Sequence, residues 1–305
     1  MQPNVIPADP PFLGAHRIAS PGEEHADAIL FGAPHGTPYP GIDNRVHERT
    51  AATLRRANAF DADWASHWNY DFGGPLLGER GFRLADLGDL ATSPLDGPVN
   101  RALIEATTRS ILDAGAVPIM LGGDDSVPIP YLAAFDEPIT ILQIDAHIDW
   151  REQRRGEPLG YSSTMRRASE LPHVERIVQV GMRNFGSARR GELEIAAGWG
   201  ATIIPARDVH HHGIGIVLEQ IAPGARVVVT FDCDALDASA MPAVMAPSPG
   251  GLTYTQVTDL VSGVATLGSI AGFDLIEFVP ERDRDGTCAI TAASLVMHVV
   301  GTLAR

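Results

Sequence analysis

Apolar and polar residues alternate in blocks along the chain, and each block has the length of a strand or a helix. Strands are expected over residues 26–33, 83–87, 117–121, 139–145, 174–180, 202–204, 226–231 and 270–278. Helices are expected over residues 46–58, 98–114, 191–198, 216–221, 254–267 and 287–303, with a further proline-interrupted helix ending near residue 135. Such an order predicts an α/β fold, a three-layer αβα sandwich around a mostly parallel sheet.

The block pattern also predicts how the chain is divided. Residues 1–25 are rich in proline and read as an irregular N-terminal arm, which could pack on the body or on a neighbouring subunit. Residues 26–305 contain no low-complexity linker and no internal repeat, so we expect them to form one domain.

One apolar strand, residues 139–145, runs directly into potential metal ligands. Asp145, His147 and Asp149 follow one another at every second position, so in an extended segment their side chains share a face. Buried carboxylates without partners are costly, and a divalent cation is a common compensation. The segment therefore predicts a metal site at the end of this strand.

A second strand, residues 226–231, repeats this design and ends in Asp232 and Asp234. Together the two strand ends could hold a pair of metal ions. Cys233 lies between the two aspartates and should point away from the metals as a buried structural thiol. A turn is expected where Gly88 and Asp89 follow the strand over residues 83–87.

The amino-acid composition excludes several classes of catalytic chemistry and of binding partner. All 23 basic residues are arginine, which excludes Schiff-base lysines, lysine-anchored pyridoxal phosphate and the P-loop lysine. A formal net charge of −15 argues against nucleic acid and anionic membranes as partners and favours cationic small molecules. The two cysteines are expected to be free thiols. Without a membrane-length apolar run or a signal-peptide pattern, the expected location is the cytoplasm.

Four motifs at predicted strand ends resemble those of the ureohydrolase family, the arginases, agmatinases and related amidinohydrolases. They are GGDDS at 122–126, DAHID at 145–149, FDCDALD at 231–237 and IEFVPERD at 276–283. GAPHGTPYPG at 32–41 and MPAVMAPSPGGLT at 241–253 are also similar to family segments, so the resemblance covers most of the chain.

The resemblance implies two divalent ions, most often Mn²⁺ with Ni²⁺ as an alternative, bridged by Asp145, Asp232 and a hydroxide. Asp149 with Asp125 would complete one site, and His147 with Asp234 would complete the other. The metals would make hydroxide available near neutral pH to attack a guanidinium carbon and release urea and an amine. The resemblance also suggests a homo-oligomer, a trimer or a hexamer.

The predicted active site includes further residues. Asp149, Glu277 and Tyr161 are assigned catalytic roles, and Glu277, His35 and Ser162 are assigned to substrate binding. Glu277 would hold the guanidinium by hydrogen bonds and orient its carbon.

Two departures from the family pattern bear on activity. In the first, Asp125 stands where the family has the histidine of GGDHS. An aspartate suits manganese, whereas nickel and zinc prefer imidazole. A fifth carboxylate facing two dications should also raise the pKa of the bridging water and weaken its activation.

In the second departure, the family's proton-shuttle histidine falls at Tyr161 or at Ser162, depending on which flanking residues are aligned. Neither is a natural shuttle at pH 7, since tyrosine titrates near ~10. His35 or one of the histidines 210–212 could serve as the proton shuttle instead, although the latter three are expected to lie in a solvated loop.

The motifs and their departures from the family pattern leave three functions to consider. The first is a dinuclear metal-dependent amidinohydrolase acting on a small guanidino compound such as agmatine. The second is a catalytically weakened homologue that serves as a structural or regulatory subunit beside an active paralogue. The third, a deacetylase with a single zinc ion, fits poorly because the second strand end supplies more carboxylates than one zinc needs.

Overall fold

A computed structural model describes residues 4–186 and 188–305 of the chain. Its strands are β1 (Val5–Ile6), β2 (His16–Arg17), β3 (Ala28–Ala33), β4 (Leu84–Leu90), β5 (Val117–Gly122), β6 (Ile139–Ile144), β7 (Val174–Met182), β8 (Thr202–Pro205), β9 (Arg226–Asp232) and β10 (Ser269–Ile276). They form one sheet in the order β1-β4-β3-β5-β10-β9-β6-β7-β8, with β2 also paired to β4. The strand pairings are parallel except that of β1 with β4.

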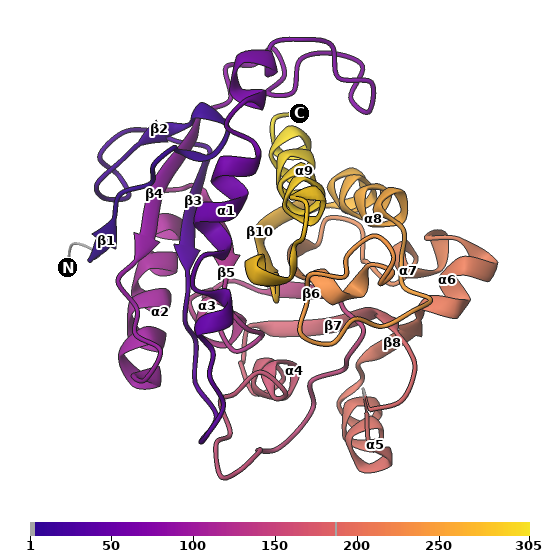
Figure 1. The fold of residues 1–305 in the computed structure, drawn as a ribbon. Helices are drawn as coiled ribbons and strands as arrows, with labels where there is room; N and C mark the ends of the chain where they lie inside the picture. The colour runs from indigo at the N-terminus through magenta and orange to yellow at the C-terminus, as the bar shows by residue number, and fades with distance from the viewer. Residues whose placement is uncertain (1–3, 187) are drawn as a thin grey trace.

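Helices cover both faces of this sheet (Figure 1). They are α1 (Thr50–Ala57), α2 (Gly97–Asp113), α3 (Pro128–Ala133), α4 (Thr164–Ala168), α5 (Arg190–Trp199), α6 (Ala206–His212), α7 (Gly215–Leu218), α8 (Tyr254–Leu267) and α9 (Thr287–Leu303). One apolar cluster joins the sheet to α1 and to α6 through α9, and a second joins it to α2 through α5. Two cores on opposite sides of one sheet confirm the predicted three-layer αβα sandwich.

Local signals account for where several helices begin. The carboxylate of Asp96 accepts a hydrogen bond from the backbone of Val99 and caps α2. Thr253 and Gln256 form a reciprocal capping box at the start of α8. These helices, like α9, lie within a residue of the predicted bounds because cap chemistry is local and therefore visible in the sequence.

The order of the strands places the acidic motifs side by side. Strands β5, β10, β9 and β6 are consecutive neighbours in the sheet. The residues that end or follow them are GGDDS, Glu277, Asp232 and Asp145, respectively. Parallel strands deliver their carboxyl ends to the same edge of the sheet, so four distant segments of the chain meet there.

Several local predictions were wrong. The strand expected to turn at Gly88 continues to Leu90, because Gly88 has a φ of 92° and a register irregularity there absorbs the bend within β4. The histidines 210–212 form the last turn of α6 rather than a loop, and Gly213 ends that helix.

Three other segments differ from prediction in extent. Helix α1 begins only at Thr50, after a separate 3-10 turn over Arg45–His47 (η2). Helix α4 had no predicted counterpart. In the N-terminal arm, the two-residue strands β1 and β2 pair with β4 and extend the sheet, while most of residues 4–25 have no regular structure.

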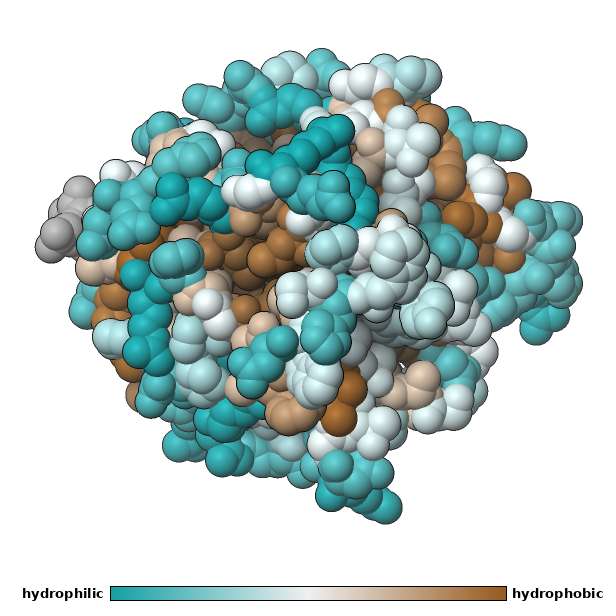
Figure 2. Space-filling model, turned by 90° about the horizontal axis from the view of Figure 1, so that it is seen from above, coloured by the Kyte–Doolittle hydropathy of each residue, from teal (hydrophilic) through white to brown (hydrophobic). Residues whose placement is uncertain are grey.

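The surface is more hydrophilic than the two apolar cores. Figure 2 shows that the face seen from above consists largely of hydrophilic residues, with smaller hydrophobic areas among them. Among the described residues, we find no helix with the length and apolar character needed to span a membrane.

Candidate metal centre

The four strand ends border a cavity of about 350 Å³. Its lining includes six of the predicted site residues from these motifs, namely Asp125, His147, Asp149, Asp232, Asp234 and Glu277. Tyr161 and Ser162 line it as well. A cavity of this size suits a small ligand, and its floor is strongly acidic.

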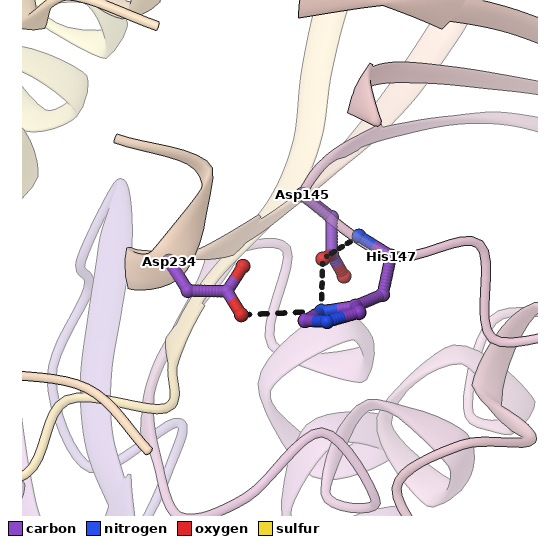
Figure 3. Close-up of side chains that lie close together, drawn as sticks. All are labelled: Asp145, His147 and Asp234. Carbon is purple, nitrogen blue, oxygen red and sulfur yellow. Dashed lines mark hydrogen bonds and ion pairs between the residues drawn. The ribbon is translucent and has the colours of Figure 1, made fainter. Parts of the chain in front are cut away.

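Two groups of potential metal ligands lie in this floor. In the first, Asp145, His147 and Asp234 offer ligand atoms within 4.8 Å of one another. The Nδ1 atom of His147 is 3.1 Å from Oδ2 of Asp234 and 3.4 Å from Oδ1 of Asp145 (Figure 3). The His147 ring thus lies between carboxylates that come from two different strands, as expected for a shared ligand set.

The second group consists of Asp125, Asp145 and Asp149, whose ligand atoms also lie within 4.8 Å of one another. Both carboxylate oxygens of Asp125 are buried and have no hydrogen-bond partner within the described part of the chain. A buried carboxylate left in this state is unfavourable unless a cation balances it. The donor set therefore fits two divalent ions, and Asp145 belongs to both groups.

The pKa shifts of these side chains also indicate a site for divalent cations. Burial, reinforced by neighbouring carboxylates, raises the pKa of Asp125, Asp149 and Asp232 well above the ordinary range. Burial opposes protonation of His147, but its hydrogen bonds with Asp145 and Asp234 raise its pKa to about 12. Crowded carboxylates cannot all ionise without a counter-charge, and divalent cations would supply it.

The geometry of the ligand segments differs from the prediction. Residues 145–149 are not an extended strand, and Asp149 has a positive φ of 50°. The left-handed turn brings Asp149 towards Asp125, while His147 faces Asp234. Asp232 lines the cavity and accepts a hydrogen bond from the backbone of Asp234 at 2.6 Å, but it belongs to neither ligand group.

A buried amide network supports these ligands and was not recognised in the sequence. Nε2 of Gln143 donates to Asp145 at 2.7 Å and to Asp149 at 2.9 Å. Gln179 donates to the Gln143 side chain and accepts a hydrogen bond from the Trp150 indole at 2.8 Å. Gln143 is the one residue of β6 that is neither apolar nor β-branched. This polar residue in an otherwise apolar strand was the feature of the sequence that could have indicated a buried hydrogen-bond network.

Arg183 is a second residue that the sequence analysis missed. Its guanidinium donates to the carbonyls of Asp234, Leu236 and Ser248 at 2.5, 3.1 and 2.8 Å, respectively. It thereby ties the end of β7 to the segment that carries Asp234. No sequence pattern links Arg183 to this segment, since the contact depends on the fold.

Glu277 stands at the same edge, directly after β10. Its Oε1 accepts a hydrogen bond from the backbone of Asp125 at 3.0 Å, and its Oε2 lies 3.5 Å from Nε2 of His47. Burial raises the pKa of Glu277 to about 7. The backbone φ of Glu277 is 63°, and a strained non-glycine residue of this kind is often found at functional sites. His47, on η2, was another residue that sequence analysis missed.

The remaining predicted residues fall in different places. The Tyr161 hydroxyl accepts a hydrogen bond from Arg154 at 2.5 Å, and burial raises its pKa. The Ser162 backbone donates to the Tyr39 hydroxyl. His35 is buried against Thr92, 3.0 Å away, and does not line the cavity. Cys233 is buried, as predicted.

Comparisons with known proteins agree with this geometry. The family model described as "Arginase family" matches residues 26–301. N(1)-aminopropylagmatine ureohydrolase of Thermus thermophilus is 34% identical over 235 residues, which cover 74% of this chain and 78% of that protein. Guanidinobutyrase of Pseudomonas aeruginosa is 28% identical over 72% of this chain and 71% of its own length.

A solved structure extends the likeness to the fold. Agmatine ureohydrolase of Thermoplasma volcanium has a TM-score of 0.77 and 27% identity, covering 91% of this chain and 89% of that chain. The family match spans nearly all of the sheet and all four acidic strand ends. The chain therefore belongs to the arginase family.

Proposed function

We propose that the protein is a dinuclear metal-dependent amidinohydrolase that hydrolyses a small guanidino compound to urea and an amine. The observation that supports this most directly is the pair of ligand groups that share Asp145 beneath a cavity lined by Glu277. The enzyme is a hydrolase of carbon–nitrogen bonds in linear amidines, in keeping with its family.

In this proposal the two ligand groups would bind the metal ions. Asp125, Asp145 and Asp149 would hold one ion, and Asp145, His147 and Asp234 the other, with Asp232 as a further bridging ligand. When bound, the two ions would supply hydroxide near neutral pH for attack on the guanidinium carbon.

Glu277 would orient the substrate. Its carboxylate can accept hydrogen bonds from two guanidinium N–H groups, which fixes the plane of the guanidinium over the floor. Because the pKa of Glu277 is about 7 through burial, a cationic guanidinium would favour its ionised form. The hydrogen bond from the Asp125 backbone holds the carboxylate in place.

We further propose manganese as the metal, because Asp125 replaces an imidazole ligand with a carboxylate. A homo-oligomer and a cytoplasmic location accompany this proposal, the first from the family resemblance and the second from the sequence pattern. The sequence feature that favours the second function, a structural or regulatory subunit, is that the motif resemblance puts Ser162 or Tyr161 where the family has its shuttle histidine.

Urea release by the purified full chain tests the enzyme proposal. The protein would be loaded with Mn²⁺ or Ni²⁺ and given agmatine, aminopropylagmatine, arginine and 4-guanidinobutyrate. We expect urea from at least one of them, with manganese the better metal. Glu277→Gln should retain the metal and lose activity by about 100-fold or more, since Glu277 is outside both ligand groups. Two bound ions without urea from any compound would favour the regulatory subunit instead.

A further inference from the structure

Between the floor and the mouth of the cavity, the charged side chains of the wall form pairs, with one exception. Asp43 pairs with Arg45 at 2.5 Å, and Arg151 pairs with Glu192 at 3.4 Å. Arg154 also lines the cavity, but no carboxylate oxygen of the described residues lies within 4.0 Å of its guanidinium. The wall therefore presents one guanidinium, that of Arg154, which forms no ion pair with the described residues.

Neutral contacts hold the Arg154 guanidinium. Its Nη1 donates to the Tyr161 hydroxyl at 2.5 Å, and its Cζ lies 5.3 Å and 5.5 Å from the ring centroids of Tyr39 and Tyr161. The two rings meet edge to face, with centroids 4.7 Å apart. Since a guanidinium has five N–H donors, these contacts orient the group and leave donors for a ligand.

The backbone around Arg154 is also well defined. Arg154 and Glu157 exchange two backbone hydrogen bonds of 3.0 Å. The two residues between them, Arg155 and Gly156, have positive φ values of 55° and 85°, as in the tight turn of a hairpin. A residue at the base of such a turn is presented in one direction, so the positive group is prepared before a ligand arrives.

Glu277 and Arg154 line the same cavity of about 350 Å³. A linear ligand whose guanidinium lies at Glu277 can place its other end at Arg154, because both residues line this one cavity. An anionic end would gain charge-assisted hydrogen bonds there, and a planar carboxylate matches the guanidinium fork with two parallel bonds. A cationic end would instead meet a like charge, which disfavours it.

We infer that Arg154 is a specificity-determining residue that selects guanidino compounds with a carboxylate tail, the ω-guanidino acids, over those with an amine tail. This inference rests on the proposed amidinohydrolase function and adds the substrate class to it. Tyr39 and Tyr161 act as positioning residues for Arg154 in this arrangement.

A matched pair of substrates tests the inference, because 4-guanidinobutyrate and agmatine share chain length and guanidino group and differ in tail charge. For the manganese-loaded full chain, we expect kcat/KM to be at least about tenfold higher with 4-guanidinobutyrate. Arg154→Gln should raise KM for 4-guanidinobutyrate by about tenfold with kcat nearly unchanged, because a tail contact contributes to binding in both ground and transition states. Arg154→Glu should invert the preference.

Arg155→Gln is the matched control, since Arg155 is exposed, donates to the Pro40 carbonyl and does not line the cavity. It should leave the ratio of the two substrates unchanged. Agmatine turned over as well as 4-guanidinobutyrate, or an equal loss on both in Arg154→Gln, would overturn the inference and leave the amidinohydrolase function intact.

The absence of urea from every compound would count against the enzyme function instead. Calorimetric titration with the same two compounds then decides the inference independently. Tighter binding of 4-guanidinobutyrate that Arg154→Gln removes would support the role of Arg154, and equal or absent binding of the two would overturn it.

Discussion

At the scale of single residues, Asp125 is the side chain whose chemistry bears most on catalysis. Its two buried oxygens have no hydrogen-bond partner among the described residues, and Asp145 and Asp149 lie in the same ligand group. In the proposed dinuclear centre, a carboxylate at this position would bring the number facing the two ions to five, with Asp145, Asp149, Asp232 and Asp234. Each added negative ligand weakens the ability of the metals to acidify water.

Asp125→His should therefore increase both turnover and the affinity for nickel. The imidazole removes one negative charge and is the ligand that nickel prefers. Turnover near neutral pH should rise on the order of tenfold for each unit by which the pKa of the attacking water falls. Metal analysis and urea release measure the two effects, and Asp125→Ala, which should lose metal, is the control. Unchanged metal content and turnover in Asp125→His would contradict a ligand role for Asp125.

Gln143 gives a second test at this scale. Its amide bridges Asp145 and Asp149 and is itself held by Gln179. Gln143→Leu keeps a similar volume but removes both hydrogen bonds, so metal affinity should fall by about 10–100-fold, as is typical when a group that orients metal ligands is lost. Competition with a metal-sensitive dye measures this. Gln143→Glu, which adds a charge between two carboxylates, should be worse than leucine, and equal affinities in all three proteins would refute the positioning role.

At the scale of elements, the site depends on how β7 holds the segment after β9. Arg183 follows β7, and its half-buried guanidinium donates to carbonyls of Asp234, Leu236 and Ser248. These residues lie outside the ten strands of the sheet, so the one Arg183 side chain supplies their carbonyls with hydrogen-bond donors. The element that carries Asp234 is therefore fixed by a residue distant in sequence.

Arg183→Met should destabilise the fold as well as the metal site. Leaving buried carbonyls without donors costs about 1–3 kcal/mol each, so we expect the free energy of unfolding to fall by at least about 2 kcal/mol. Urea denaturation measures this change. Arg176→Met is the control, because Arg176 lies exposed on β7 itself and its loss should cost less than about 0.5 kcal/mol. A similar effect of both substitutions would exclude the proposed role of Arg183.

At the scale of the whole molecule, the acidic floor links metal binding to stability. Six ligand candidates come from strand ends at one edge of a sheet whose two faces are both packed. A metal that binds these side chains only when they are assembled stabilises the whole domain, because the unfolded chain does not present them together.

Addition of Mn²⁺ should accordingly raise the thermal unfolding midpoint. At a free concentration of a hundred times Kd, the free energy of unfolding rises by about 2.7 kcal/mol per site. Asp145→Asn should abolish most of this increase, since Asp145 belongs to both ligand groups. Asp259→Asn, which changes an exposed residue of α8, should retain it. A midpoint that does not respond to manganese in the unsubstituted chain would contradict the metal centre.

The sequence alone was sufficient for most of the elements and for the prediction that acidic residues gather at strand ends. Apolar runs of strand length, capped helices and acids at strand ends are local patterns, so β6, β9, α2 and α8 were predicted close to their observed bounds. The same patterns predicted Asp145, His147 and Asp234 as metal ligands, and the structure brings their ligand atoms within 4.8 Å of one another. Two local predictions were wrong for local reasons. Gly88 lies within a strand, but a glycine followed by an aspartate resembles a turn. The end of α6 is short and polar, and such a sequence resembles a loop.

Only the tertiary structure decided which of these groups meet. The sheet order β5-β10-β9-β6 differs from the chain order, and it brings Glu277 beside Asp125, 152 positions away. His47 reaches Glu277, and Arg183 reaches the segment after β9, only through the fold, whereas His35 is excluded from the cavity. Strand pairing is non-local, and the partners of a polar side chain are set by that pairing rather than by its sequence neighbours.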